Sequence, residues 1–202
     1  SKLYRQVSYF DLGKIGDKGL AIIKGFDMAK GEWIGFVDAD GSTSPEAFYV
    51  LLKNVKEYDG IIATRWSKSS KINKSQPISR IIASRVFNVM VRFILGLHFT
   101  DTQCGAKLFK KRAIKCVGPK LGITKWGFYI YLLYLMKYHR FRIIEYPTVW
   151  QDHEDSHLNL KKTVPEMFFA LMRLRLIYSP LRVIVQCYDL LPEKMTLKPW
   201  LK

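Results

Sequence analysis

Asp38 and Asp40 are the residues of this sequence whose type and spacing first suggest chemistry. They follow the short apolar run 33–37. Because this run is short, contains bulky side chains and is bounded at both ends, it predicts a buried strand better than a helix. Both carboxylates are therefore expected where that strand ends. A hard divalent cation takes oxygen ligands of this kind and commonly shares them with the phosphate oxygens of a substrate. Because Asp-x-Asp pairs also occur at ordinary turns, the spacing alone leaves both interpretations open.

Cationic and polar side chains are expected near the two aspartates. Arg65 ends a second β-rich run, GIIATRW, and Arg80, Ser84 and Asn88 recur at helical spacing within 78–96, which places them on one stripe of a helix. A guanidinium fork matches phosphate oxygens, so the set predicts a site for two phosphorylated ligands and a bridging metal. The alternatives are a surface arginine at position 80 and a packing or capping group at position 88.

Helical and strand-like segments alternate along the first half of the chain. Residues 17–31 have helical apolar spacing and lead into the strand at 33–37, and Ser44 before Pro45 predicts the capped start of a helix reaching about Lys56. The polar, lysine-rich stretch 67–77 is predicted to be a loop. This alternation favours an α/β fold with a largely parallel sheet, whose functional loops lie at the carboxyl ends of the strands.

The composition limits the class of protein and of partner. The 202 residues are 49% hydrophobic and carry a formal charge of +16, which predicts one globular domain with an appendage and favours anionic partners. Nucleic acid is not expected, because that interpretation rests on charge alone and the aromatic residues are spread through apolar runs. The three cysteines have no pairing or CxxC spacing, so neither a disulfide framework nor a zinc site is indicated. No stretch reaches the roughly 18 apolar residues of a spanning helix, and no signal-peptide pattern opens the sequence.

The character of the chain changes after Trp150. Large apolar residues there alternate with cations, and the pattern predicts a basic amphipathic helix pair broken near residues 179–180. An anionic membrane surface is one expected partner, and ordinary helical packing onto the domain is the alternative. We therefore divide the chain into a domain over residues 1–157 and a basic helical, membrane-surface segment over residues 158–202. The cations that interrupt the apolar residues over 160–191 are Lys161, Lys162, Arg173, Arg175 and Arg182.

Several spaced motifs resemble those of a known enzyme family. The stretch GDKGLAIIKGFDMAKGEWIGFVDADGSTSPEAF resembles glycosyltransferase family 2, whose nucleotide-sugar enzymes have the GT-A fold. Downstream, ATRW, the R-x-x-x-S-x-x-x-N spacing, DTQCGAKLF and IIEYPTVWQDHEDSHLN resemble in the same order the dolichyl-phosphate mannose and dolichyl-phosphate glucose synthases, with DTQCG nearest the glucosyl branch.

The resemblance implies a GT-A, Rossmann-like fold with a mostly parallel sheet, flanking helices and a C-terminal amphipathic helix pair. It implies an inverting, metal-dependent hexosyltransferase that moves glucose or mannose from UDP-glucose or GDP-mannose to a polyprenyl (dolichyl) phosphate. The enzyme would be peripheral on the cytoplasmic face of a membrane, with Mg²⁺ or Mn²⁺ as the cofactor. Because a phosphate acceptor is already ionised near neutral pH, no general base is required.

The same resemblance implies roles for particular residues. The implied metal ligands are Asp38 and Asp40. The implied catalytic residues are Asp40, Arg65 and Arg80. The implied substrate-binding residues are Lys18, Asp38, Arg65, Arg80, Ser84, Asp101 and Gln103.

The sequence departs from the family pattern in two places. The pattern normally begins further upstream, with a strand ending in Asn-Glu and another strand carrying an acidic pair, which bind the nucleotide; neither is in this sequence. Related synthases also commonly carry Phe-Asp-x-Glu where this chain has Phe128, Tyr129, Ile130 and Tyr131. A base role is therefore not carried over, and the aromatic run is also explained as a buried helix. The alternative function is an inactive or differently specific membrane-associated module that uses the fold for binding.

Overall fold

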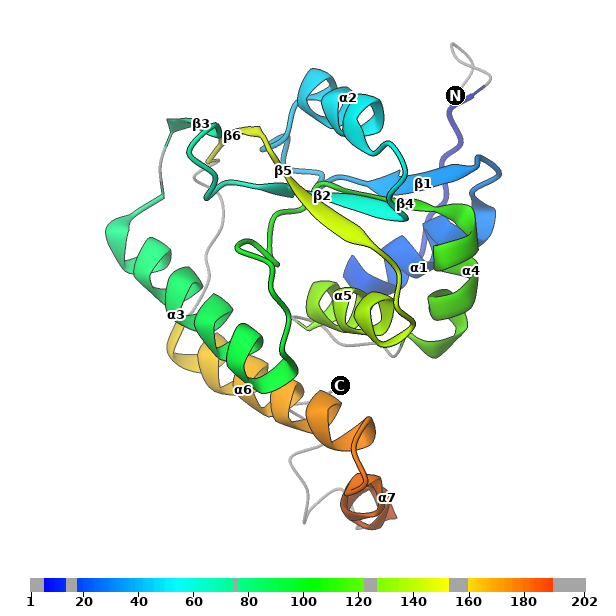
Figure 1. Cartoon of the computed structure of the whole chain (residues 1–202), viewed down its shortest axis with the longest axis vertical. Helices are drawn as coiled ribbons and strands as arrows, with labels where there is room; N and C mark the ends of the chain where they lie inside the picture. Colours follow the sequence, from blue (N-terminus) through cyan, green and yellow to red (C-terminus); the bar gives the residue numbers. More distant parts are fainter. Residues whose placement is uncertain (1–5, 14–17, 75, 122–126, 153–159, 191–202) are drawn as a thin grey trace.

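A four-stranded sheet forms the centre of the molecule. The computed structural model describes residues 6–13, 18–74, 76–121, 127–152 and 160–190 (Figure 1). The strand order is β1-β4-β2-β5, in which β4 is antiparallel to both of its neighbours and β2 is parallel to β5. Three of these four strands therefore run in the same direction, which confirms the expected α/β fold with a mostly parallel sheet. The strands are β1 (Trp33–Phe36), β4 (Lys107–Lys110), β2 (Gly60–Thr64) and β5 (Ile143–Pro147).

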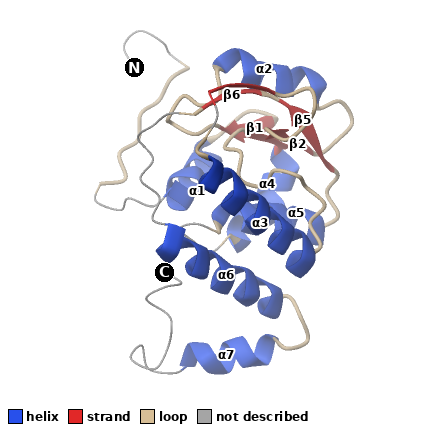
Figure 2. Cartoon of the chain, turned by 90° about the vertical axis from the view of Figure 1, so that its left-hand side faces the viewer, coloured by secondary structure: helices blue, strands red, loops and turns tan. Residues whose placement is uncertain are grey.

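Helices cover both faces of the sheet. Helix α2 (Pro45–Asn54) lies on one face, and α1 (Lys18–Met28), α4 (Lys111–Val117) and α5 (Phe128–Tyr138) lie on the other (Figures 1 and 2). A 3₁₀ turn over Gly118–Lys120 follows α4. Helix α3 (Ile78–Leu95) and α6 (Leu160–Ile177) pack against each other below the second layer, and α7 (Arg182–Leu190) lies farthest from the sheet (Figure 2).

The alternation of side chains along the strands produces two hydrophobic clusters. Ile61 and Ala63 of β2 pack on the α2 side with Leu51, while Ile62 and Phe109 contribute to the larger cluster on the side of α5. Successive strand residues point to opposite faces, so a strand covered by helices on both sides reads as a continuous apolar run. The run GIIAT is fully buried for this reason.

The predicted elements around the first strand are confirmed. The Oγ of Ser44 accepts a hydrogen bond from the backbone N–H of Ala47 at 3.2 Å, as an N-cap does, and Pro45 is the first helical residue. Helix α1, before β1, and helix α3, which follows β2 and β3, also form where their apolar spacing predicts them. These elements bring the chain segments that carry Asp38, Asp40 and Arg65 to the ends of β1 and β2.

The loop predicted for residues 67–77 contains a short strand. Strand β3 (Lys71–Lys74) pairs in parallel with β6 (Val149–Gln151) and forms a separate two-stranded sheet. The prediction was wrong here because KINK has one apolar residue among polar ones, so no alternation marks it as a strand, and its partner strand is far away in the sequence.

The C-terminal helix pair breaks where expected. Helix α6 ends at Ile177 and α7 begins at Arg182, and the Oγ of Ser179 accepts a hydrogen bond from the N–H of Leu181 at 3.1 Å. Leu171 and Leu174 of α6 are buried in the larger hydrophobic cluster. Residues 153–159 and 191–202, which belong to the predicted boundary and to the end of the predicted segment, lie outside the described residues. In the described part of the chain, no helix has the length and apolarity needed to cross a membrane.

Candidate functional site

Asp38 and Asp40 lie just beyond the end of β1, as the sequence predicts. Asp40 is exposed, and its Oδ1 accepts a hydrogen bond from the N–H of Ser42 at 2.9 Å, which fixes the turn after the strand. Both aspartates line a groove of about 630 Å³ between α1 and β1. Lys18, at the start of α1, lies in the same lining. The groove therefore brings two carboxylates and one ammonium group to a single opening.

The Asp38 carboxylate is held from two sides. Its Oδ1 accepts from the Lys18 Nζ at 2.5 Å and from the Tyr129 hydroxyl at 2.5 Å. The ring of Tyr129 stacks on Phe36 of β1, with centroids 5.5 Å apart and an interplanar angle of 25°. Burial, reinforced by Asp38, raises the pKa of Tyr129, so the phenol stays protonated and donates to the carboxylate. Sequence analysis missed this contact, which joins residues on β1 and α5.

Gly105 gives the Asp38 carboxylate its space. A Cβ built at position 105 would overlap both carboxylate oxygens of Asp38. Any larger residue would therefore have to displace the side chain that Lys18 and Tyr129 hold. This requirement explains the glycine in the DTQCG motif without invoking a direct contact with substrate.

Lys107 is a fully buried cation beneath this cluster. Its Nζ donates to the carbonyl of Cys104 and lies 4.6 Å from the centroid of the Tyr129 ring, while the Lys18 Nζ lies 4.7 Å from that centroid. Burial lowers the pKa of Lys107 to about 8, although the carboxylates of Asp101 and Asp38 oppose the shift. Lys107 is thus an electrostatic link between the Asp38 cluster and the neighbouring loop.

The depressed pKa of Lys107 predicts a pH dependence of stability. Between about pH 8 and its ordinary pKa of 10.5, this side chain binds a proton in the unfolded chain but not in the folded one. The free energy of unfolding contributed by this group therefore rises with pH across that window. A Lys107→Met variant should lack this increment, as measured by urea unfolding of both proteins at pH 8 and pH 10. The same rise in both proteins would contradict the assignment.

Arg65 and Asp101 form a buried, two-pronged ion pair. The Nε of Arg65 lies 2.7 Å from Oδ2 of Asp101 and the Nη2 lies 3.0 Å from Oδ1. The exposed fractions of the two side chains are 9% and 2%. Burial opposes both charges, but each holds the other ionised: the pKa of Arg65 is raised and that of Asp101 is lowered. The guanidinium also lies 5.1 Å from the ring of Trp150.

This ion pair shapes the loop that contains the DTQCG motif. Asp101 Oδ1 also accepts the backbone N–H groups of Gln103 at 3.2 Å and Cys104 at 3.1 Å. From β5, Glu145 Oε1 accepts the N–H groups of Thr100 and Asp101, each at 2.8 Å. Arg65 and Asp101 therefore brace the loop against β2, and the direct contacts with substrate predicted for them stay predictions.

Three buried polar atoms have no hydrogen-bond partner among the described residues. They are the Nδ2 of Asn88, the Oγ1 of Thr102 and the Nε2 of Gln103. Buried donors and acceptors are normally paired, so each of these needs an explanation such as water or a ligand. The predicted substrate-binding role of Gln103 is compatible with its unpaired amide and stays a prediction.

Helix α3 is tied to the site by a residue that sequence analysis missed. The Nη1 of Arg85 donates to the carbonyl of Thr100 at 3.2 Å, and its guanidinium lies 5.0 Å from the ring of Trp66. The predicted stripe lies on the inner side of α3, where Arg80 and Ser84 are partly buried and Asn88 is buried. Their predicted contacts with an acceptor phosphate stay predictions.

Asp38 and Asp40 could hold a divalent cation only together with ligands from water or substrate. Among the described residues, no group of three or more His, Cys, Asp and Glu side chains could hold a metal ion. Mg²⁺ usually takes one or two carboxylates and completes its shell with water and substrate phosphates. Asp38 and Asp40, beside an open groove, match that habit when a diphosphate supplies further oxygens. The exposed Asp40 is the more available of the two, because Asp38 Oδ1 is already bonded to Lys18 and Tyr129.

Comparison with known proteins gives a family match and several relatives. The sequence model described as glycosyl transferase family 2 matches residues 1–118. The chain is 28% identical over 167 residues to a dolichyl-phosphate beta-glucosyltransferase of Dictyostelium discoideum, covering 80% of this chain and 51% of the relative. It is 27% identical over 192 residues to a dolichyl-phosphate beta-glucosyltransferase of Homo sapiens, covering 92% of this chain and 58% of the relative. The chain thus spans about half the length of these relatives.

Solved structures support the fold. Glucosyl-3-phosphoglycerate synthase from Mycobacterium tuberculosis, in complex with Mn²⁺, uridine-diphosphate-glucose and phosphoglyceric acid, superposes with a TM-score of 0.51 at 15% identity. The match covers 84% of this chain and 55% of that one. At this identity the similarity establishes the shared GT-A fold.

Proposed function

The chain belongs to glycosyltransferase family 2, and we propose that it transfers a hexose from a nucleoside-diphosphate sugar to a polyprenyl (dolichyl) phosphate. The observation that carries this proposal is the meeting of Asp38, Asp40 and Lys18 at one groove beyond the end of β1. Carboxylates for a cation and an ammonium for phosphate oxygens are the groups that a diphosphate leaving group requires. The similarity to dolichyl-phosphate beta-glucosyltransferases supports the acceptor and favours glucose over mannose.

The reaction needs little proton chemistry from the protein. An oxygen of the acceptor phosphate attacks the anomeric carbon, a new carbon–oxygen bond forms with inversion, and the bond to the nucleoside diphosphate breaks. An ionised phosphate needs no general base. Tyr129, whose phenol donates to Asp38, is a positioning group here and not a base. A phosphate acceptor therefore suits this chain better than a sugar hydroxyl that must lose a proton.

The proposed cofactor is Mg²⁺ or Mn²⁺, held by Asp38 and Asp40. When bound, the cation would neutralise the developing charge of the leaving diphosphate as a Lewis acid. The protein's own residues prepare this position. Lys18 and Tyr129 fix one oxygen of Asp38, and Ser42 fixes one oxygen of Asp40. Lys18 is also close enough to the groove to bind the donor diphosphate.

The proposed acceptor site lies between α3 and the loop that contains the DTQCG motif. Arg80 and Ser84 would bind the acceptor phosphate, since a guanidinium matches phosphate oxygens and a hydroxyl adds a hydrogen bond. Arg65 and Asp101 would shape this site by bracing the loop. We also propose that both residues contact the substrate directly. Gln103 would use its unpaired amide to bind substrate.

The proposed location is the cytoplasmic face of a membrane, where the protein is peripheral. A polyprenyl phosphate is anchored in lipid, so the acceptor itself requires that the enzyme approach a bilayer. The basic segment 158–202 supports this location, because cations near an anionic leaflet each contribute about 1 kcal/mol. The alternative function remains a binding module on the same fold with no transfer activity.

A transfer assay tests the proposed function. The purified chain is incubated with radiolabelled UDP-glucose, Mn²⁺ and dolichyl phosphate in detergent, with GDP-mannose in a parallel reaction. The expected product is a β-linked glucosyl phosphate lipid, because inversion of an α-linked donor gives the β anomer. Inorganic phosphate replaces dolichyl phosphate in the control reaction. Binding of UDP-glucose with no lipid-linked product from either donor would support the binding module and overturn the proposal.

A further inference from the structure

Helix α3 presents a stripe of large apolar side chains to solvent. The stripe spacing of four, four, three and four residues keeps them on one face of a helix. Each of these side chains is at least 54% exposed, and Phe93 reaches 91%. The opposite side of α3 is also apolar where it enters the core, through Phe87, Val91 and Leu95. The exposed stripe consists of Ile78, Ile82, Val86, Val89 and Phe93.

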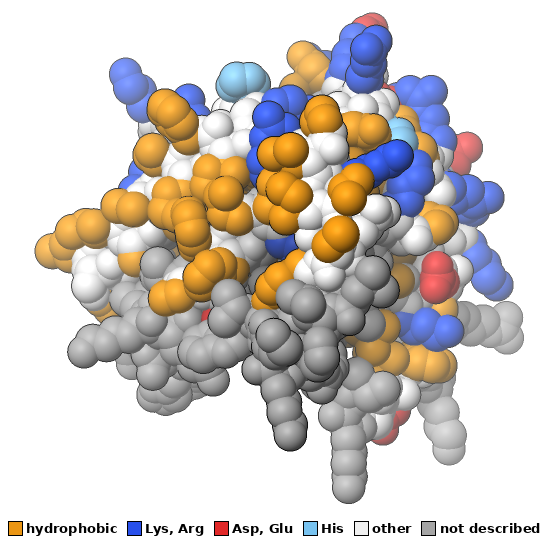
Figure 3. Space-filling model, turned by 90° about the horizontal axis from the view of Figure 1, so that it is seen from below, with side chains coloured by type: hydrophobic (Ala, Val, Ile, Leu, Met, Phe, Trp, Pro, Cys, Tyr) orange, Lys and Arg blue, Asp and Glu red, His pale blue; other side chains and the backbone are white. Residues whose placement is uncertain are grey.

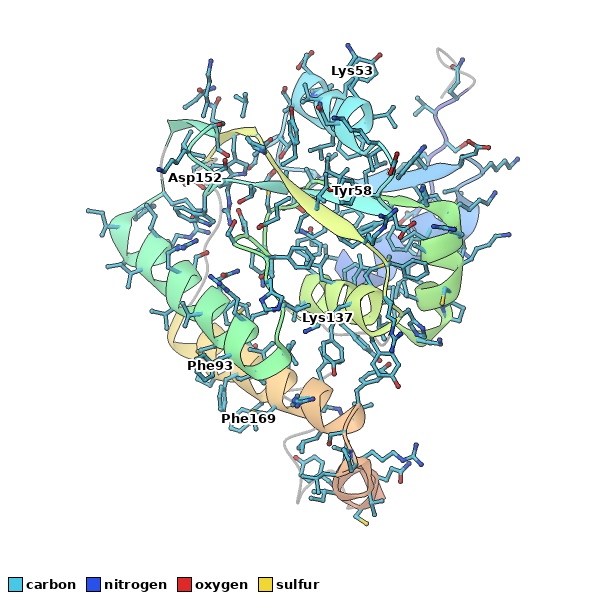
Figure 4. The ribbon with its side chains drawn as sticks, viewed as in Figure 1. Lys53, Tyr58, Phe93, Lys137, Asp152 and Phe169 are labelled. Atoms are coloured by element: carbon cyan, nitrogen blue, oxygen red, sulfur yellow. The ribbon has the colours of Figure 1, made fainter. Side chains whose placement is uncertain are left out.

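The stripe continues onto the neighbouring helices. Helix α6 packs against α3 and exposes Phe168, Phe169 and Met172. Leu181, which precedes α7, and Val183 and Ile184 in its first turn are exposed as well. Figure 4 draws Phe93 and Phe169 toward the same outer side of the α3–α6 pair, away from the sheet. Figure 3 shows hydrophobic side chains gathered on the lower face of the molecule. These exposed apolar residues of α3 and α6 and at the start of α7 together form the outer apolar face.

The charges around the outer apolar face are mainly positive. Helix α3 contains no acidic residue; of its three arginines, Arg80 lies on the inner side and Arg85 contacts Thr100 and Trp66, which leaves Arg92 beside this face. Arg92 of α3, Arg175 of α6 and Arg182 of α7 are exposed. Long cationic side chains beside an apolar surface can place their stems on it and their charged ends at its edge. A soluble monomer rarely leaves a contiguous apolar surface of this kind uncovered.

We propose that the outer apolar face docks on the surface of an anionic lipid bilayer, with α3 lying in the interface. Apolar residues on one face combined with flanking arginines form the pattern of an interfacial helix. The positive charges match anionic headgroups, and they would repel one another across an interface between two copies of this chain. The docking surface therefore lies on α3 as well as on the basic C-terminal helices.

Docking by α3 would also place the proposed acceptor site at the height of the headgroups. Arg80 and Ser84 lie on the side of α3 opposite Ile82 and Val86, and a helix with its side chains is about 10–12 Å across. With the apolar side about 5–10 Å deep in the bilayer boundary, the polar side lies at the level of lipid phosphates. This part of the inference rests on the proposed function, whereas the docking itself does not.

Vesicle sedimentation of matched variants tests the docking. The α3 variant carries Ile82→Gln, Val86→Gln and Phe93→Gln. These substitutions remove exposed apolar groups, and they do not weaken the helix because Gln has a higher helix propensity than Ile, Val or Phe. The control variant carries Tyr49→Gln, Val50→Gln and Leu52→Gln, which remove exposed apolar groups from α2 on the other face of the sheet. Vesicles contain phosphatidylcholine with an equal weight of phosphatidylserine, or phosphatidylcholine alone. Circular dichroism and thermal unfolding establish that both variants are folded.

The wild-type chain and the α2 variant should bind the anionic vesicles equally. The α3 variant should bind them about 1000-fold more weakly, since each of its three large side chains kept out of lipid contributes roughly tenfold. Binding should weaken with salt and on neutral vesicles. Unchanged binding of a folded α3 variant, or equal losses in both variants, would overturn the proposal. So would a wild-type dimer in light scattering that becomes monomeric in the α3 variant, because a second copy would then cover the face.

A transfer measurement separates this inference from the proposed function. With a short, soluble prenyl phosphate as the acceptor, the α3 variant should match the wild-type rate, because Ile82, Val86 and Phe93 lie outside the proposed site. With dolichyl phosphate in vesicles it should be slower in proportion to its lost binding. If no protein transfers sugar to either acceptor while the vesicle results hold, docking stands and the proposed function fails.

Discussion

Replacing Asp101 with alanine is expected to lower the free energy of unfolding by about 3–5 kcal/mol, the usual cost of breaking a buried ion pair. The guanidinium of Arg65 would stay buried without its counter-ion, because two of its donors are directed at Asp101. The N–H groups of Gln103 and Cys104 would lose their acceptor at the same time. Urea unfolding of the wild-type and variant proteins measures the difference.

Two further variants show whether the ion pair is the cause. Asp40→Asn removes an exposed negative charge from the same end of the sheet but keeps an oxygen for the N–H of Ser42, and it should change stability by no more than about 0.5 kcal/mol. The double variant Arg65→Met with Asp101→Leu replaces both charges with apolar groups, and it should recover part of the loss. An Asp101→Ala protein that unfolds at the same urea concentration as the wild type would show that Arg65 finds another partner or water.

Local signals in the sequence were sufficient for the elements that deliver the two aspartates. Bulky residues bounded by polar ones predict β1, and Ser44 followed by Pro45 predicts the start of α2. Both predictions are confirmed because each depends on residues within one turn or one strand. The overall α/β fold followed from the alternation of such segments, and it agrees with the topology of the sheet.

The contacts within the site depend on pairings over long distances in the sequence, which local patterns do not specify. The aromatic run at 128–138 indicates a buried helix, but nothing in it indicates that the Tyr129 hydroxyl reaches Asp38, 91 residues earlier. The position of Arg65 at the end of a strand suggests a guanidinium that is free to bind phosphate. Only the fold shows that the carboxylate of Asp101 occupies its donor groups. Lys107 likewise lies in an apolar run whose burial makes its charge costly.

The exposure of one side of α3 also depends on packing that the sequence pattern does not specify. The polar spacing of Arg80, Ser84 and Asn88 marked one side of α3 from the sequence, and the structure does place that side inward. The apolar stripe of a helix is normally buried, so nothing in the spacing of the apolar residues indicates that those on the other side face solvent. Their exposure follows from packing, because α6 contacts α3 beside this stripe and leaves it open.

The second large effect is expected from Asp40→Asn, which should reduce the rate of hexose transfer by about 100- to 1000-fold, the range found when one group that stabilises transition-state charge is removed. The amide keeps an oxygen for the N–H of Ser42, so the turn after β1 is preserved. It removes the negative charge that would hold a divalent cation against the leaving diphosphate. Transfer rates are measured over a range of Mn²⁺ concentrations at saturating donor, and Mn²⁺ binding in the presence of UDP is measured by electron paramagnetic resonance.

Asp27→Asn is the matched control, because Asp27 is an exposed aspartate on α1 whose charge the proposed mechanism does not use. It removes the same charge from the protein, so it corrects for any general change in the attraction of cations. Asp38→Asn is less informative, since losing its charge would also alter the contacts with Lys18 and Tyr129. If Asp40→Asn transferred sugar at the rate of Asp27→Asn with unchanged Mn²⁺ affinity, Asp40 would not be a metal ligand. Weaker Mn²⁺ binding with a normal rate at saturating Mn²⁺ would instead limit its role to holding the cation before the reaction.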